Sequence, residues 1–95
     1  MVVGVLQLIL HCHASHSLKE KRGVVRKIKS RLRNEFNVSV SECGEQDQWQ
    51  TIVLGVCQVG SDHSYVQGTL QAATNFVERL HLAEVVKTQV ELLHY

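Results

Sequence analysis

The chain is poor in residues that interrupt or rigidify a fold. Its 95 residues contain no proline, and only 5% of them are aromatic. It has neither a linker nor a low-complexity segment, so we expect a single domain over residues 1–95. A chain of this length buries roughly 60 to 70% of its unfolded surface without cross-links. The hydrophobic share of 44% is ordinary for a globular domain.

Cysteine and long apolar runs are also scarce. Cys12, Cys43 and Cys57 are an odd number at wide spacing, with no Cys-x-x-Cys pair, which predicts reduced thiols. No segment approaches the roughly 18 apolar residues of a membrane span. The opening MVVGVLQLIL lacks the basic start and the small-residue cleavage site of a signal peptide. We therefore expect a cytoplasmic protein with no membrane partner.

Basic residues are rare outside one segment. Eight of the ten Lys and Arg residues lie between Lys19 and Arg33, where only Glu20 opposes them. Apolar residues at helical spacing predict an amphipathic helix over Ser17 to Phe36. Ser17 is placed to cap this helix, with Glu20 completing a capping box. The apolar side consists of Leu18, Val25, Ile28, Leu32 and Phe36.

The cations of this helix form a basic ridge, centred about 105° from the apolar side on a helical wheel. The ridge consists of Lys19, Arg22, Arg26, Lys29 and Arg33. Clustered cations on one helix face bind nucleic-acid phosphates with little regard to sequence. The alternative is a solvated surface whose cations keep the protein soluble and meet acidic groups elsewhere on the fold. For RNA binding we expect contacts from Lys19, Lys21, Arg22, Arg26, Lys29 and Arg33, with Lys27 and Arg31 second in rank.

The other segments alternate in the way that strands do. We predict strands over Met1 to His11, Asn37 to Glu42, Trp49 to Val59 and Ala83 to Leu93, and a second helix from Ser61 or Asp62 to about Leu80. The polar run from Cys43 to Gln48 predicts a hairpin loop. In the last strand, Val86, Val90 and Leu92 are expected on the inner face.

This order of elements predicts an α+β fold, the ferredoxin-like βαββαβ plait. The plait is a four-stranded antiparallel sheet with two helices on one face. Its first and third strands are central, which agrees with their apolar character on both faces.

One face of the predicted sheet has no helix to cover it. Its central positions include Val3, Val5, Ile9, Val53 and Cys57, and no aromatic residue. Base stacking on this face, as in RNA-recognition motifs, is therefore disfavoured. The apolar residues favour a partner, most simply a second copy of the chain. A modest apolar surface left bare is the alternative.

No pattern of residues points to catalysis or to a metal. The spacing of His11, Cys12, His13 and His16 is not that of a closed zinc site, and loop histidines are the simpler interpretation. Ser17 lacks a Gly-x-Ser-x-Gly context. An acylphosphatase-like enzyme would need an Arg in the first strand–helix loop, where there is none. We predict no enzyme activity, cofactor, metal or small-molecule substrate, and expect Trp49 to anchor the core or a sheet edge.

Three motifs occur in this order along the chain: SLKEKR at Ser17 to Arg22, FNVSVSE at Phe36 to Glu42 and DQWQTIVLGV at Asp47 to Val56. Together they resemble the YlxP-like family of small bacterial proteins of unknown function. The resemblance covers residues 1–60 well and the rest in length and pattern only. Where relatives tend to have Pro and Gly after the first histidine, this chain has CHASH.

The resemblance implies a ferredoxin-like domain in the setting of ribosome assembly or translation. Genes of the family commonly lie among those for transcription and translation factors, beside a ribosome-binding factor. The leading prediction is a non-enzymatic domain whose first helix contacts RNA or a ribosomal particle. The rival is a protein-interaction or homo-oligomerisation module that uses the uncovered sheet face.

Overall fold

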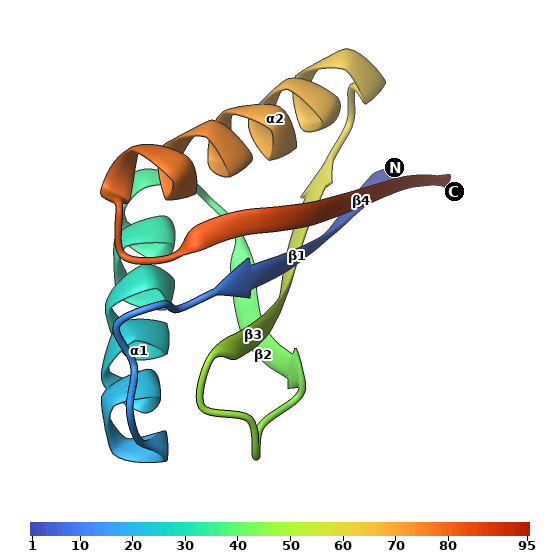
Figure 1. The fold of residues 1–95 in the computed structure, drawn as a ribbon. Coiled ribbons are helices and arrows are strands. Elements are labelled where there is room, and N and C mark those ends of the chain that lie inside the picture. The colour runs from blue at the N-terminus through green and yellow to red at the C-terminus, as the bar shows by residue number, and fades with distance from the viewer.

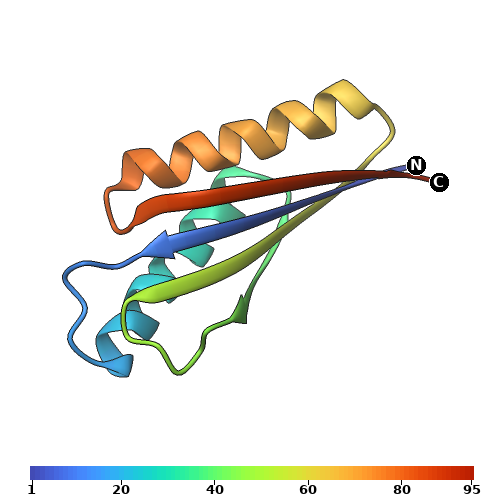
Figure 2. The same cartoon turned by 45° about the vertical axis from the view of Figure 1, so that its right-hand side comes forward.

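Two helices pack on one side of a four-stranded sheet in the computed structural model, which describes residues 1–95 (Figures 1 and 2). The elements in order are β1 (Val2–His11), α1 (Leu18–Glu35), β2 (Ser39–Gly44), β3 (Thr51–Gly60), α2 (His63–Leu80) and β4 (Glu84–His94). All pairings are antiparallel, and the strand order is β2-β3-β1-β4. The predicted ferredoxin-like plait and the central places of β1 and β3 are confirmed.

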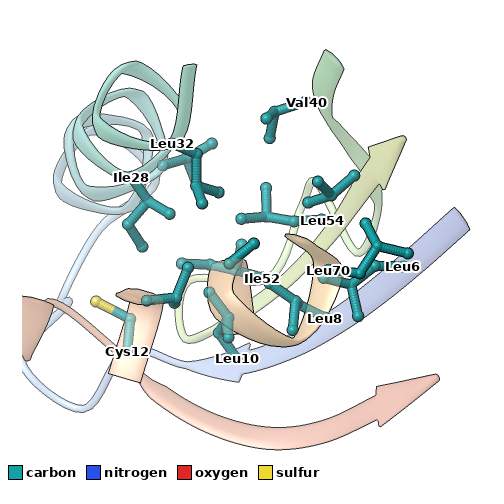
Figure 3. Close-up of a cluster of buried hydrophobic side chains, with 14 of the residues drawn as sticks. Leu6, Leu8, Leu10, Cys12, Ile28, Leu32, Val40, Ile52, Leu54 and Leu70 are labelled. Atoms are coloured by element: carbon teal, nitrogen blue, oxygen red, sulfur yellow. The ribbon is translucent and has the colours of Figure 1, made fainter. Parts of the chain in front are cut away.

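The core lies between the sheet and the helices (Figure 3). Every second residue of β1 faces the helices, because side chains alternate across a strand. The fully buried side chains include Leu6, Leu8 and Leu10 of β1, Ile52 and Leu54 of β3, Ile28 and Leu32 of α1, and Leu70 of α2. The helices thus meet one continuous apolar layer, which fixes how each is rotated about its axis.

Both helices begin at side-chain caps. Ser17 Oγ accepts a hydrogen bond from the Glu20 backbone N–H at 3.1 Å. The Glu20 carboxylate accepts from the backbone N–H of His16 at 2.6 Å, one residue before the cap itself. Asp62 caps α2 by accepting from the Tyr65 backbone N–H at 2.9 Å. These bonds satisfy N–H groups that have no partner inside the helix.

Gly4 lets α2 approach the middle of the sheet closely. A Cβ at this position would lie 2.5 Å from Val66 Cγ1 and 2.8 Å from Leu70 Cδ1. Carbon atoms do not approach so closely without strain, so a larger side chain here would force Val66 and Leu70 of α2 to shift.

The connection between β2 and β3 lies later in the chain than predicted. β2 continues to Gly44 rather than ending at Glu42, and β3 begins at Thr51 rather than at Trp49. Trp49 therefore lies in the connecting loop with 54% of its surface exposed. The expectation that it anchors the core or a sheet edge is wrong, because the loop holds the indole outside the sheet.

A bulge in β4 changes which residues face the core. Ile9 pairs with Lys87 whereas Leu10 pairs with Val85, which leaves Val86 as an extra residue. An extra residue reverses the alternation of side chains beyond it. Val85 consequently packs against the core, and Val86 is 61% exposed. The inward placement predicted for Val86 is wrong.

Neither helix combines the length and the apolar character that crossing a bilayer requires.

Candidate nucleic-acid interface

α1 turns its charged side away from the sheet. Val25, Ile28 and Leu32 are buried against the core, and Phe36 at the end of the helix meets Phe76 of α2 edge to face, with ring centroids 5.6 Å apart. Because apolar and basic residues follow the same helical period, burying one set exposes the other. Lys19, Arg22, Arg26 and Arg33 are exposed, and Lys29 is half-buried.

No carboxylate of the chain pairs with these exposed cations. The ion pairs within 4.0 Å are those of His13 with Glu84 and of Lys21 with Glu42. The cations of the ridge thus do not meet acidic groups elsewhere on the fold. The part of the alternative in which they form a solvated surface that keeps the protein soluble remains open. Arg33 is partly engaged, since its Nη2 donates to the backbone oxygen of Val40 at 2.8 Å. The basic ridge is a surface of uncompensated positive charge.

Lys21 does not belong to this surface. Only 1% of its surface is exposed, and its Nζ lies 3.1 Å from Oε2 of Glu42 on β2. The same ammonium donates to the backbone oxygen of Glu45. Oε2 of Glu42 accepts no hydrogen bond of good geometry, so this contact is an ion pair defined by distance. The prediction that Lys21 contacts RNA phosphates is wrong, because its charge is buried between α1 and the β2–β3 hairpin.

The sequence contained the signal for this burial. Lys21 lies four residues before Val25 and seven before Ile28, which places it within the apolar stripe of the helix. A lysine at such a position requires a buried partner. Glu42 supplies one from a strand that is distant in sequence.

Lys27 and Arg31, ranked second from the sequence, share a cleft with Arg26. This cleft of about 510 Å³ lies between α1 and the end of α2. Its lining residues are Arg26, Lys27, Ser30, Arg31, Leu80 and Leu82. Three cations and a hydroxyl group around one hollow suit an anionic group such as a phosphate. The positive surface therefore continues from the ridge around α1.

The β2–β3 loop, which contains the exposed Trp49, lies at the same end of the molecule as the start of α1 (Figure 1). The β2–β3 loop is tied to the segment before α1, because the backbone N–H of Cys12 donates to the oxygen of Gln50 at 2.7 Å. Gln50 Nε2 donates to the oxygen of Ser15 at 3.3 Å. Together with the Lys21 contacts, these bonds hold the loop beside the N-terminal turns of the basic helix.

A second polar cleft, of about 500 Å³, opens where β1 ends and β4 begins. His11, His13, Glu78, His81 and Glu84 line it, and His13 Nε2 lies 2.8 Å from Glu84 Oε1. The sequence pattern singles out His11 and His13 but gives no signal for the other three, which lie around the distant α2–β4 junction. No group of three or more His, Cys, Asp and Glu side chains is arranged to hold a metal ion.

The five apolar residues predicted to mediate self-association lie on the open face of the sheet. Val5 pairs with Cys57, and Ile9 pairs with Val53. Val3 continues the row towards the end of the sheet, opposite Val59. Val5 is exposed whereas Val53 is buried, so only part of this stripe is accessible to a partner. Self-association through this face remains a prediction.

Comparisons with known proteins find a family and a fold. A family model described as a protein of unknown function (DUF503) matches residues 3–90. Uncharacterized protein YlxP of Bacillus subtilis (strain 168) is 40% identical over 90 residues, which cover 95% of this chain and 98% of that protein.

Among solved structures, the de novo designed protein Foldit4 has a TM-score of 0.56 at 12% identity, covering 100% of this chain and 99% of its own. SnoaB, a cofactor-independent oxygenase from Streptomyces nogalater, has a TM-score of 0.49 at 13% identity, covering 99% of this chain and 91% of its own. The first likeness shows the fold alone, and the second carries no argument about chemistry.

Proposed function

This chain belongs to the DUF503 family, whose function is unknown, and we propose that it is a non-enzymatic domain that binds structured RNA through α1. The observation that carries the proposal is the absence of carboxylate partners for the exposed cations of α1. A dense row of unpaired cations attracts a polyanion, and binding releases the counterions condensed on that polyanion. Ribosomal RNA or its precursors in assembling particles are the proposed setting.

The shape of the site favours contacts to the RNA backbone. An 18-residue helix is about 27 Å long, so its cations reach several successive phosphates. Guanidinium groups suit phosphate because their planar N–H donors bind two oxygens at once. Long side chains on a convex helix do not enter the deep, narrow major groove of A-form RNA. We therefore expect recognition of charge and shape rather than of sequence.

Trp49 adds a preference for RNA that contains unpaired bases. It lies in the β2–β3 loop, which hydrogen bonds hold beside the N-terminal turns of α1, where Lys19 and Arg22 begin the ridge. An aromatic ring stacks on any base that is free of the duplex, and such stacking contributes about 1–3 kcal/mol per base. The composite site, cations for the backbone and an indole for a base, fits a hairpin or bulged RNA.

Salt dependence tests the proposal directly. Affinity for a fluorescent RNA hairpin is measured by anisotropy across a salt series. With five phosphate contacts, the affinity should fall about 500-fold between about 50 and 200 mM salt, a log–log slope of about −4.5. An affinity that does not change with salt, or no binding at the lowest salt, would contradict the proposal. Salt-sensitive sedimentation with ribosomal particles from a bacterial lysate would place the activity in its setting.

Replacing Trp49 by alanine separates stacking from charge. We expect Trp49→Ala to weaken binding to a looped hairpin by about 10-fold, because the stacked base loses its partner. The salt slope should stay unchanged, since no cation is removed. Trp49→Phe should keep most of the affinity, and a blunt RNA duplex should bind both variants as it binds the wild type. Equal weakening on hairpin and duplex would exclude a stacking role.

A further inference from the structure

β4 is a long edge strand whose outer side has no partner. It has 11 residues and pairs only with β1, whereas the opposite edge, β2, has six residues and a bulge of its own. Every residue from Val86 to Glu91 is exposed, including Val90 with 47% of its surface. An open edge of this length presents unsatisfied backbone groups to any second strand.

We propose that β4 pairs antiparallel with β4 of a second copy, about a two-fold axis at Gln89, to form a continuous eight-stranded sheet. This inference concerns a surface separate from α1 and does not depend on RNA binding. It also differs from self-association through the open sheet face, because the contact is made edge to edge. The evidence is the self-complementary order of residues along β4.

Backbone geometry limits the possible registers. Residues directly opposite each other in an antiparallel pair point to the same face of the sheet. A two-fold axis perpendicular to the sheet must therefore place a residue opposite itself, rather than opposite its sequence neighbour. Each possible register is therefore identified by the residue that lies on the axis. Sliding one strand by a single residue would place side chains that point to opposite faces of the sheet opposite each other.

The register centred on Gln89 places residues of opposite charge opposite each other. Lys87 of each copy lies opposite Glu91 of the other, Thr88 lies opposite Val90, and Gln89 lies opposite itself. Centring the axis on Lys87 or Glu91 would instead place like charges opposite each other, which is destabilising. Centring it on Thr88 or Val90 leaves both charges without a partner of opposite sign. Gln89 is thus the centre that satisfies Lys87 and Glu91 together.

Both charged residues are available for this pairing. Neither Lys87 nor Glu91 has an ion-pair partner within its own chain. Their neighbours on β1 are Ile9 and Val5, which are apolar. The ladder is regular from Lys87 to Glu91, since the bulge in β4 lies just before Lys87. Opposite charges facing each other across two strands, twice in one dimer, select this register over the others.

The surroundings of β4 allow a second copy to approach. α2 is the helix that lies nearest to β4, and His63 at its start contacts His94 through nitrogens 2.7 Å apart. On that side of α2 the next exposed residues at helical spacing are Gln67 and Gln71, which are uncharged. The part of this side of α2 between Gln67 and Gln71 thus presents no charge to a second copy, and Glu78 follows on the same side nearer the end of the helix. α1 packs against β2 at the opposite edge of the sheet and against α2, so this pairing does not use its cations.

Charge exchange tests the pairing. The mass in solution is measured by sedimentation equilibrium for the wild type, Lys87→Glu, Glu91→Lys and the double variant Lys87→Glu/Glu91→Lys. Each single variant creates two like-charge contacts, so its dimer dissociation constant should rise about 10- to 100-fold. The double variant restores both pairs with reversed sign and should dimerise as the wild type does. Circular dichroism checks that each variant is folded.

A mixture of the two single variants is the sharpest measurement. Neither dimerises well alone, but a Lys87→Glu chain beside a Glu91→Lys chain has opposite charges at both contacts, so a heterodimer should form. A wild type that stays monomeric at millimolar concentration would overturn the proposal. So would a dimer that is insensitive to both single variants but is dissociated by Val5→Glu, because it would use the open face instead.

Discussion

Replacing Lys21 by methionine should lower the free energy of unfolding by about 3 kcal/mol. Methionine fills most of the space of the lysine side chain, so packing changes little. The loss comes from the Glu42 carboxylate, whose side chain is only 17% exposed and whose cation lies 3.1 Å away. The backbone oxygen of Glu45 loses its donor as well. Urea unfolding followed by circular dichroism measures the change.

Two further variants isolate the buried pair. Lys19→Met changes an exposed lysine of the same helix and should alter stability by less than about 0.5 kcal/mol. Lys21→Met/Glu42→Leu removes both charges and should recover most of the stability lost in the single variant. A Lys21→Met protein as stable as the wild type would show that the pair contributes nothing. If folded Lys21→Met protein binds RNA with an affinity that depends less steeply on salt, Lys21 does contact the RNA.

Reversing three cations of α1 should abolish RNA binding without unfolding the protein. In Lys19→Glu/Arg22→Glu/Arg26→Glu, three of five phosphate contacts become repulsive, and we expect affinity at low salt to fall by more than about 100-fold. Whatever binding remains should have a salt slope of about −1.8, as two contacts would give. These three side chains make no hydrogen bond or ion pair within the protein, unlike Arg33, which donates to the backbone oxygen of Val40.

Arg79 provides a matched control for the effect of net charge. Like Arg26 it is an exposed helical arginine, but it lies in the last turn of α2. Arg26→Glu and Arg79→Glu change the net charge equally, and only the first should weaken RNA binding and reduce the salt slope. If both weaken binding to the same extent, the protein attracts RNA through its overall charge, and the proposed interface on α1 is wrong.

The order of elements and the orientation of both helices could be predicted from the sequence. Each depends on a local period: two residues for β1 and β3, and about 3.6 for α1 and α2. Packing on one side of a sheet then follows, because each element has one apolar side to bury. The burial of Lys21 could also be predicted, because the same helical period places it within the apolar stripe of α1.

Other features depended on which distant segments meet. The bulge in β4 arises from its register with β1, and so placed Val85 rather than Val86 inward. The exposure of Trp49 depended on where the β2–β3 hairpin turns. The absence of partners for the cations of α1 depended on where every carboxylate lies in space.

The sequence by itself therefore determined the fold and the basic helix, because local periodicity specifies burial. Only the tertiary structure decided which charges are neutralised, which edges stay open and which side chains share a cleft. Those properties depend on distances between residues that are far apart in the sequence, and no local pattern encodes such distances.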